Sequence, residues 1–313
     1  MFARFSAKCL AAKYNSPMRA VITPAIASNL HLVGDRWSLL ILRDLFAGRN
    51  RFEALQTHTG AGRATLTRRL NSLMEGELVV RVPYSEGRFE YHLTRKGQGL
   101  YAAAMCAWAW EQQFAPTADG GLPGSLIHES CGAPLNPRMI CRACEAPLTR
   151  AEIRLDPGTN FQEQVLSIQA ENGSRRRRNS GPGDDDNMTN IASLVGDRWS
   201  ILILVAMFFG VARFDEFHRL LGIATNILGA RLNRLMEAGV LRKEPYQQNP
   251  VRYRYLLSES GEALFGFVMA VWQWAKVWTP EGEAANALTH ECGAALIVDV
   301  VCASCNKSLT LNS

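Results

Sequence analysis

The sequence repeats itself once, and this duplication limits the possible folds more than any other feature. The segment LVGDRWSLLIL, which starts at Leu32, returns as LVGDRWSILIL from Leu194. At the same offset, RRLNSLMEGELV in the first half is matched by ARLNRLMEAGVL in the second. A unit of this length is an independent domain rather than an element of a solenoid. The chain therefore consists of two copies of one domain, called repeat 1 and repeat 2 below.

The alignment of the two copies sets the expected boundaries. Repeat 1 spans 1–153, with a main domain at about 20–115 and a Cys/His segment at 126–150. Repeat 2 spans 188–313, with a main domain at 188–279 and a Cys/His segment at 288–310. Between them, 154–187 contains SRRRRNSGPGDDDN, whose composition is typical of a flexible charged linker. Met18 is a plausible alternative start.

Composition and charge exclude several classes of protein. With 47% hydrophobic and 20% charged residues, the chain can form hydrophobic cores and is not expected to be disordered. The longest apolar run, 201–211, is too short to cross a membrane, and no signal peptide is recognisable, so we expect a cytoplasmic protein. Repeat 1 has 18 basic and 12 acidic residues, whereas repeat 2 has 11 of each. A polyanionic partner is therefore possible, above all for repeat 1.

Both repeats show the same order of helices and strands. Repeat 2 has apolar periodicity that predicts helices over 193–209, 214–221, 224–238 and 258–277, with a hairpin at 240–245 and 252–257. Repeat 1 shows the equivalent segments at 29–46, 51–57, 62–75, 78–93 and 94–114. This order predicts an α+β fold, mainly α, with two tandem winged helix-turn-helix domains. The pattern favours DNA binding, although winged helices also serve as protein-interaction modules.

These segments resemble the HxlR-type bacterial transcriptional regulators, winged helix proteins with MarR-like architecture. The resemblance rests on LVGDRWSLLIL, on GIATNILGARLNRLMEAGVL from Gly222 and on the Pro-Tyr wing. It implies DNA binding as two-fold dimers near promoters, with dimerisation helped by the long C-terminal helix. Many members also carry a redox-sensing cysteine thirteen residues before the GDRW tryptophan. Here Pro24 and Asp186 occupy that position, so no thiol sensor is expected there.

The residues expected to contact DNA lie on the second helix of each helix-turn-helix and on the wings. Arg63 is suited to a bidentate contact with guanine, and Asn226 to one with adenine. Arg231 is expected to have either a phosphate-binding or a structural role. The expected contacts are Arg63, Thr65, Thr67, Arg68 and Arg88 in repeat 1 and Thr225, Asn226, Arg231, Arg252 and Arg254 in repeat 2.

The closing helix of each repeat carries two tryptophans two positions apart, Trp108 and Trp110 in repeat 1 and Trp272 and Trp274 in repeat 2. Two such positions cannot fully share one face of a helix. We expect one of each pair to face an interface, either in a homodimer or in an intramolecular pseudo-dimer. A pocket for an apolar or aromatic small-molecule effector is the alternative.

Each repeat ends in a Cys/His segment that predicts a structural zinc site. The ligands are expected to come from within one repeat. They are His128, Cys131, Cys141 and Cys144 in repeat 1 and His290, Cys292, Cys302 and Cys305 in repeat 2. Each set would form a small zinc-ribbon-like module. The alternative is free or redox-active thiols, because the His-Cys spacing differs between the copies.

No enzyme is predicted. The chain lacks the H-x-E and P-C-x-x-C combination of zinc deaminases, and it also lacks H-E-x-x-H, G-x-S-x-G and P-loop motifs. The sequence therefore predicts a regulator that binds double-stranded DNA, with repression by promoter occlusion as the expected mode. Two alternatives stay open. Repeat 2 could be a dimerisation or ligand-sensing module that never contacts DNA, or the whole chain could be a zinc-containing protein-interaction adaptor.

Overall fold

The structure is a computed structural model, which describes residues 32–115, 123–155, 191–278 and 288–311. Most of the predicted linker, Met18, Pro24 and Asp186 lie outside the described residues. Within the described ranges, no helix combines the length and the apolar character needed to span a membrane.

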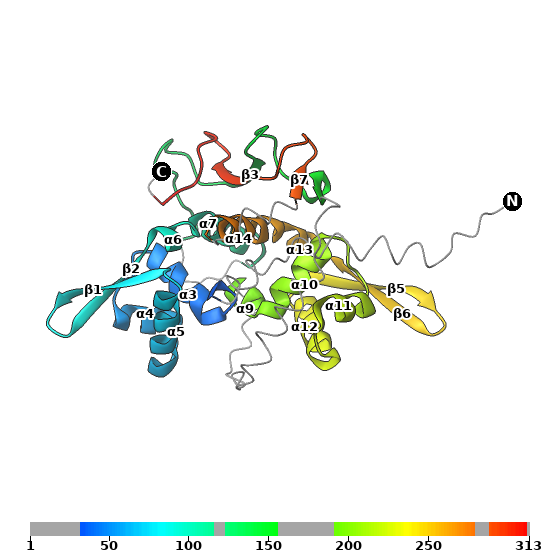
Figure 1. Ribbon diagram of the computed structural model, residues 1–313, viewed down its shortest axis with the longest axis horizontal. Coiled ribbons are helices and arrows are strands. Elements are labelled where there is room, and N and C mark those ends of the chain that lie inside the picture. Colours follow the sequence, from blue (N-terminus) through cyan, green and yellow to red (C-terminus); the bar gives the residue numbers. More distant parts are fainter. Residues whose placement is uncertain (1–31, 116–122, 156–190, 279–287, 312–313) are drawn as a thin grey trace.

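Both repeats contain a winged helix-turn-helix (Figure 1). In repeat 1 the elements are α3 (Arg36–Phe46), α4 (Phe52–Thr59), α5 (Arg63–Glu75), β1 (Val79–Ser85), β2 (Arg88–Leu93), α6 (Arg95–Gln98) and α7 (Tyr101–Phe114). In repeat 2 they are α9 (Ile191–Val195), α10 (Arg198–Phe208), α11 (Phe214–Leu221), α12 (Thr225–Glu237), β5 (Leu241–Gln248), β6 (Val251–Leu257), α13 (Glu259–Ala263) and α14 (Phe265–Val277). The hairpins β1–β2 and β5–β6 are antiparallel and form the wings.

The turn of each helix-turn-helix depends on a glycine. The helices α4 and α11 end at Gly60 and Gly222, which have φ angles of 69° and 60°. This left-handed conformation is cheap only for glycine, and it lets the chain turn into α5 or α12. These second helices are anchored by leucines spaced three or four residues apart. The fully buried anchors are Leu66, Leu70 and Leu73 in α5 and Leu228, Leu232 and Leu235 in α12.

The helix predicted over 193–209 is two helices, because the GDRW motif starts a new one. Asp197 caps α10, and its Oδ1 accepts hydrogen bonds from the backbone N–H groups of Trp199 and Ser200. Before it, a Cβ on Gly196 would lie 2.8 Å from Cα of Arg36, so only glycine allows the two repeats to approach here. The Arg36 N–H donates to the Gly196 carbonyl across this contact at 3.1 Å. The motif thus serves both helix capping and contact between the repeats.

Loss of the equivalent cap in repeat 1 should destabilise the protein. Asp35 accepts hydrogen bonds from the Ser38 N–H and hydroxyl, and it pairs with Arg69 at 2.9 Å. We expect Asp35→Ala to lower the free energy of unfolding by about 1–2 kcal/mol, the usual cost of losing an N-cap. Urea denaturation measures this, with Glu86→Ala on the exposed wing tip as control. Equal stability of the two variants would contradict the capping role.

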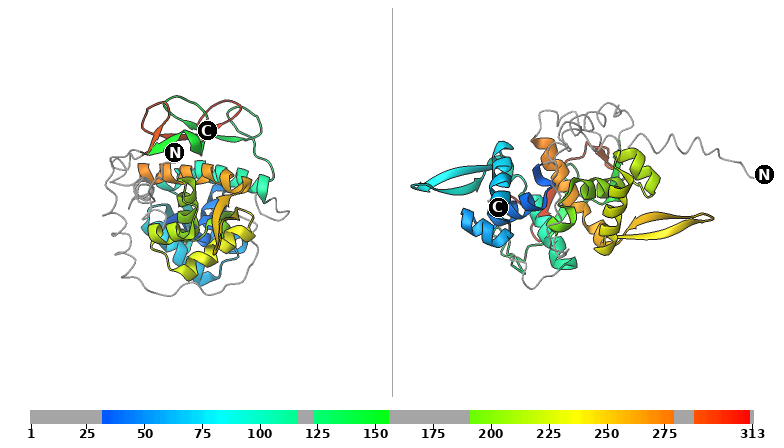
Figure 2. Two further views of the ribbon diagram at one scale, coloured as in Figure 1. Left: turned by 90° about the vertical axis from the view of Figure 1, so that its right-hand side faces the viewer. Right: turned by 90° about the horizontal axis from the view of Figure 1, so that it is seen from below.

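The two closing helices, α7 and α14, pack side by side and join the repeats (Figures 1 and 2). Their contacts are reciprocal. Trp110 Nε1 donates to the Ser260 carbonyl and Trp274 Nε1 donates to the Lys96 carbonyl, each at 2.8 Å. The two donors are 164 residues apart, as are the two acceptors, which is the pattern of a two-fold interface. One tryptophan of each pair therefore contacts the other repeat, as the spacing predicted.

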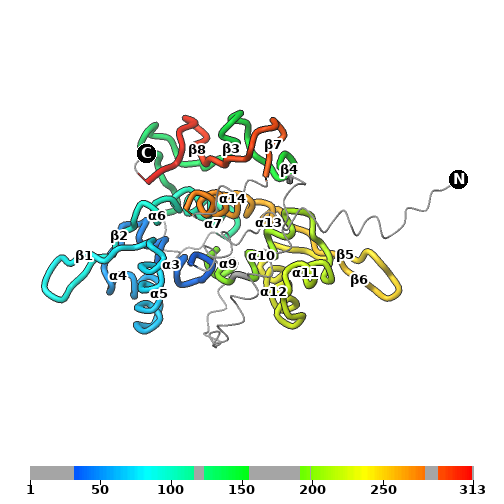
Figure 3. The backbone as a smooth tube through the Cα atoms, in the orientation of Figure 1, coloured from blue at the N-terminus to red at the C-terminus, as the bar shows by residue number. Residues whose placement is uncertain are grey.

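The Cys/His segments form one shared layer instead of two separate modules (Figure 3). The strands are β3 (Pro137–Cys141), β4 (Ile153–Leu155), β7 (Leu288–His290) and β8 (Val298–Cys302), and a 3-10 turn, η2 (Arg150–Glu152), precedes β4. Strand β3 of repeat 1 pairs with β8 of repeat 2, and β4, which runs from the last residue of repeat 1 into the start of the predicted linker, pairs with β7 of repeat 2. The layer lies beyond α7 and α14, on the side opposite to α5 and α12 (Figures 1 and 2).

Candidate nucleic-acid interface and candidate metal centres

The second helices of the two helix-turn-helix units, α5 and α12, lie on one face of the molecule (Figure 1). The wings extend outward on either side of them. In winged helix proteins, such a helix can enter a major groove while the wing contacts the backbone or the minor groove. The arrangement therefore presents two potential DNA-reading helices from a single chain.

The first turn of α5 is open to solvent. Arg63 is exposed, and its guanidinium lies over the Phe52 ring, 5.1 Å from the ring centroid. Thr67 and Arg68 are also exposed, whereas Thr65 is half-buried. The N-cap, Gly62, provides no side chain to satisfy the first backbone N–H groups. These groups carry the positive end of the helix dipole, which suits a phosphate.

The first turn of α12 also lacks a side-chain cap and is exposed, but it carries different side chains from α5. Thr225 and Asn226 are exposed, and the N-cap, Ala224, makes no side-chain cap. The two helices thus offer an arginine in repeat 1 and an amide in repeat 2. Arginine and asparagine favour different bases, so the two repeats are not equivalent in what they can recognise.

Arg231 has a partner that favours its structural role. Its Nε lies 3.0 Å from Oδ2 of Asp197, the residue that caps α10. In repeat 1, Arg69 forms the equivalent ion pair through its Nη2, which lies 2.9 Å from Oδ1 of Asp35. These ion pairs tie α5 and α12 to the starts of α3 and α10, which fixes the orientation of the second helix in each helix-turn-helix.

The predicted wing residues differ in their surroundings. Arg88 and Arg252 are exposed near the tips of their hairpins. Arg254 is also exposed, but it is paired with Glu244 across the hairpin. This hydrogen bond lowers the pKa of the Glu244 carboxyl, so the pair stays charged at neutral pH. Arg88 and Arg252 are the better candidates for phosphate contacts.

One feature of both wings escaped the sequence analysis. Arg51 stacks on Tyr84 at 4.8 Å, and Arg213 stacks on Tyr246 at 4.9 Å, measured to the ring centroids. Each pair connects the start of α4 or α11 to its wing. The signal was present, because the Arg-Phe and Pro-Tyr pairs recur at the same offset in both repeats.

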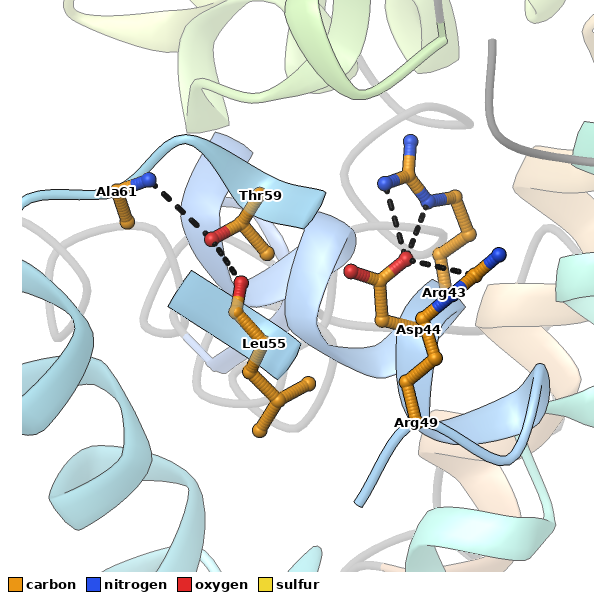
Figure 4. A network of polar contacts seen from close by, with 6 residues as sticks. All are labelled: Arg43, Asp44, Arg49, Leu55, Thr59 and Ala61. Carbon is orange, nitrogen blue, oxygen red and sulfur yellow. Dashed lines mark hydrogen bonds and ion pairs between the residues drawn. The ribbon is translucent and has the colours of Figure 1, made fainter. Parts of the chain in front are cut away.

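The turn before α5 is held by polar contacts that repeat 2 lacks (Figure 4). The Thr59 hydroxyl donates to the Leu55 carbonyl at 2.6 Å and accepts from the Ala61 N–H at 3.2 Å. Nearby, the fully buried Asp44 carboxylate accepts from Arg43 and pairs with Arg49. Repeat 2 has Leu221 and Ala206 at the positions of Thr59 and Asp44. The repeats have therefore diverged in the interior as well as on the DNA-reading helices.

A cavity of about 70 Å³ lies between the repeats, next to α3 and α7. Its wall contains Ala103, Ala104 and Ala107, with Arg43 and Glu111 as the charged groups. Burial raises the pKa of the Glu111 carboxyl, although its Oε1 accepts a hydrogen bond from the Ile191 N–H. The positions in repeat 2 that match the three alanines carry buried, larger side chains, namely Phe267, Val268 and Val271.

The eight predicted metal ligands gather in two clusters, but the predicted grouping within each repeat is wrong. Cluster 1 contains His128 and Cys131 of repeat 1 with Cys302 and Cys305 of repeat 2. Cluster 2 contains Cys141 and Cys144 of repeat 1 with His290 and Cys292 of repeat 2. Within each cluster, the ligand atoms lie within 4.8 Å of one another.

The exchange follows from strand pairing. Strand β3 runs from Pro137 to Cys141, so Cys141 lies about 13 Å from the start of the strand at 3.3 Å per residue. Its antiparallel partner β8 places Cys302 opposite Pro137. Each strand thus carries its C-x-x-C pair away from the histidine of its own repeat and toward that of the other.

The distances within the clusters suit a tetrahedral ion. In cluster 1, His128 Nδ1 lies 3.3 Å from Cys131 Sγ and 3.4 Å from Cys305 Sγ, and the Sγ atoms of Cys131 and Cys302 are 3.9 Å apart. Zn–S bonds of about 2.3 Å at tetrahedral angles give S–S separations of about 3.8 Å. A disulfide needs about 2.05 Å, so Cys131 and Cys302 do not form one, and their separation is compatible with a shared metal ion.

Thiol pKa values differ among the cluster cysteines: those of Cys292 and Cys302 are lowered, whereas those of Cys131 and Cys144 are raised, with neighbouring cysteine thiols among the causes. In cluster 2, hydrogen bonds from the Ala294 N–H and from His290 lower the pKa of Cys292 to about 7. Thiolate is the form that binds metals. By contrast, burial raises the pKa of the Cys106 thiol to about 12, so that residue is a poor nucleophile.

The chain matches the family model described as HxlR-like helix-turn-helix at residues 32–118 and 194–283. It is 39% identical over 145 residues to the HTH-type transcriptional regulator Rv3095 of Mycobacterium tuberculosis, covering 46% of this chain and 91% of the relative. It is 33% identical over 105 residues to the HTH-type transcriptional regulator YodB of Bacillus subtilis, covering 33% of this chain and 94% of the relative.

Among solved structures, PA1374 of Pseudomonas aeruginosa is 36% identical, with a TM-score of 0.26 and coverage of 37% of this chain and 70% of that one. The family model accounts for both helix-turn-helix units and their closing helices. The chain therefore belongs to the HxlR-like helix-turn-helix family of transcriptional regulators and contains the family domain twice.

Proposed function

We propose that this chain is a sequence-specific transcriptional regulator that binds two DNA half-sites with its two repeats, as an intramolecular pseudo-dimer. The observation that carries the proposal is the arrangement of α5 and α12 on one face of a body joined by α7 and α14. Two-fold dimers of helix-turn-helix proteins bind half-sites about one helical turn apart. Here both halves belong to one polypeptide, so one chain suffices for both half-sites.

The proposed operator is asymmetric. Arg63 in repeat 1 is suited to guanine, whereas Asn226 in repeat 2 is suited to adenine. Thr67 and Arg68 extend the exposed face of α5, and Thr225 extends that of α12. A homodimer with identical helices selects a palindrome, but this chain would select two different half-sites. Binding across a promoter would repress transcription by occlusion, in the cytoplasm and without any catalytic step.

The two repeats contribute unequally to the electrostatic part of binding. Repeat 1 has six more basic than acidic residues, and repeat 2 has equal numbers. Counterion release by the basic groups makes the affinity fall steeply with salt. Repeat 1 therefore provides most of the salt-dependent affinity, while repeat 2 adds selectivity through Thr225 and Asn226. If repeat 2 were only a dimerisation or sensing module, its substitutions would leave DNA binding unchanged.

A wing substitution tests the phosphate contacts. We expect Arg88→Ala to weaken binding to all duplexes similarly and to reduce the slope of log affinity against log salt by about 1. Fluorescence anisotropy across a salt series measures both quantities. Glu86→Ala, two residues away on the same wing tip, is the control and should leave the slope unchanged or steepen it. A loss confined to one DNA sequence would show that Arg88 contacts a base.

We assign Zn²⁺ to each Cys/His cluster. Three thiolates and one imidazole form a closed tetrahedral set, which is typical of structural zinc and leaves no position for a substrate. Burial of His128, Cys141, His290 and Cys302 supports such a closed site. Both ions therefore have a structural role.

The cavity beside α7 is the proposed binding site for a small-molecule effector. An occupant would contact α3 and α7 of repeat 1 and α9 and α14 of repeat 2, so its binding could alter how the repeats pack. The wall is mainly apolar, and Glu111 offers a hydrogen-bonding group. The proposed ligand class is a compact apolar or aromatic molecule with one hydroxyl or amine donor.

Filling the cavity with the side chains of repeat 2 tests this site. Ala104→Val combined with Ala107→Val reproduces Val268 and Val271. With phenol as the probe, we expect the melting temperature of the original chain to rise and that of the double variant to stay constant, because ligand binding stabilises the folded state. Equal shifts in both proteins would place phenol elsewhere.

A further inference from the structure

The exchanged Cys/His clusters are the strongest feature that the DNA-binding proposal leaves unexplained. Every ligand set combines a histidine and one cysteine from one repeat with a C-x-x-C pair from the other. From this geometry we infer that each Zn²⁺ cross-links the two repeats, and that the two ions together hold α5 and α12 at the separation that the operator requires. The DNA part of this inference rests on the proposed DNA binding, whereas the cross-link between the repeats rests on the proposed zinc assignment alone.

The ligands connect segments that are otherwise held by short ladders. Strands β4 and β7 pair over only three residues, and β3 and β8 over five. Two reciprocal backbone hydrogen bonds, from Arg142 N–H to the Ile297 carbonyl and from Ala303 N–H to the Asn136 carbonyl, add to these ladders at 2.9 Å each. An isolated pair of strands has only marginal stability in water, so the layer needs a further cross-link to be rigid.

The layer is coupled to the helices that position the DNA-reading units. The carboxamide of Gln273 in α14 accepts from the Val298 N–H at the start of β8. Lys276, also in α14, donates to the Leu296 carbonyl at 3.3 Å. On the other side, Arg150 next to β4 pairs with Glu262 in α13 at 3.3 Å. A change in the layer would therefore reach α13 and α14, and through them the packing of the repeats.

Binding of each ion displaces protons from the three thiols of a cluster to solvent, so that three thiolates and one neutral imidazole hold the metal. No oxidation takes place. Chelation of the metal returns the protons and removes the metal–ligand bonds that cross between the repeats, while the closing helices, the Gly196–Arg36 contact and the two short ladders remain. The expected consequence is a looser spacing between α5 and α12.

Crossed double substitutions distinguish exchanged sites from sites within one repeat. The pair Cys131→Ser and Cys305→Ser damages only cluster 1, whereas Cys131→Ser and Cys144→Ser damages both clusters. All three cysteines lie outside the buried core, so the variants test ligation with little loss of packing. If the ligands came from one repeat, the outcome would be reversed.

The measurement is the number of zinc ions bound per full chain, determined by elemental mass spectrometry after dialysis. We expect two ions in the original chain, one in the Cys131/Cys305 variant and none in the Cys131/Cys144 variant. Two further variants give the mirror test. The variant with Cys144→Ser and Cys292→Ser should retain one ion, and the variant with Cys292→Ser and Cys305→Ser should retain none. The reversed pattern, or an original chain without zinc, would overturn the inference. Co²⁺ spectra of folded variants give the same count through thiolate charge-transfer bands.

The consequence for DNA is measured separately. Zinc removal should lower the affinity for a selected two-half-site duplex by about 100-fold, the low end of what linked binding provides, with little change for a single half-site. Equal loss on both duplexes would indicate general unfolding, and no loss on either would overturn the spacing role. The zinc count does not depend on DNA, so failure of the DNA-binding proposal would leave it standing.

Discussion

Replacement of Arg63 by alanine is expected to weaken binding to a selected operator by about 5- to 150-fold, because one bidentate arginine–guanine contact contributes about 1–3 kcal/mol of discrimination. Arg63 is exposed at the first residue of α5, where the end of the helix can enter a major groove. Asn226→Ala should have a similar effect at the other half-site, since Asn226 occupies the first turn of α12. The operator is obtained by selection from random duplexes with the original chain.

Base substitution separates these effects. Arg63→Ala should lose discrimination at one guanine in the half-site of repeat 1 and keep it throughout the other half-site. Asn226→Ala should lose discrimination at one adenine in the half-site of repeat 2 and keep it throughout the half-site of repeat 1. Arg95→Ala serves as a control that removes the same charge, because Arg95 lies in α6 and not in α5 or α12. If Asn226→Ala bound like the original chain, repeat 2 would not read DNA, and the sensing or dimerisation alternative would replace the proposal.

Replacement of Trp274 by alanine is expected to lower the free energy of unfolding by about 3–5 kcal/mol, the range for removal of a large buried aromatic side chain. Only 3% of Trp274 is exposed, and its indole N–H crosses to the Lys96 carbonyl of repeat 1 at 2.8 Å. The substitution thus removes packing and also leaves a carbonyl of the other repeat without its donor. Equilibrium denaturation in urea measures the loss.

Two variants on the same helix identify the cause. Trp274→Phe keeps most of the packing and removes the hydrogen bond, so a smaller loss of about 1 kcal/mol is expected. Val277→Ala, at a position that is 63% exposed, should change stability by less than about 0.5 kcal/mol. A Trp274→Ala variant as stable as Val277→Ala would show that the closing helices do not hold the repeats together.

Local sequence signals predicted the helix-turn-helix units well. The expected helices 214–221 and 224–238 match α11 and α12 to within one residue, whereas the expected helix 51–57 ends two residues before α4 does. The break at Gly196 and Asp197 was less evident, because the apolar pattern continues across it. There, capping by Asp197 and the close approach to Arg36 outweigh the periodicity.

The metal ligands were identifiable by type but not by grouping. C-x-x-C pairs and nearby histidines are local features, and all eight residues lie in the two clusters. Which histidine joins which C-x-x-C depends on the pairing of β3 with β8, strands about 160 residues apart in the chain. No local spacing carries that information. The same holds for the Arg51–Tyr84 stacking, which only the parallel recurrence of both pairs in repeat 2 could have indicated.

The most direct test of the pseudo-dimer is the number of chains on one operator. Sedimentation equilibrium of the zinc-loaded chain with the selected duplex should give one chain per duplex, while hydroxyl-radical footprinting shows protection of both half-sites, centred about one helical turn apart. This result follows because α5 and α12 of a single chain share one face. Two chains per duplex, with one half-site protected by each, would contradict the account.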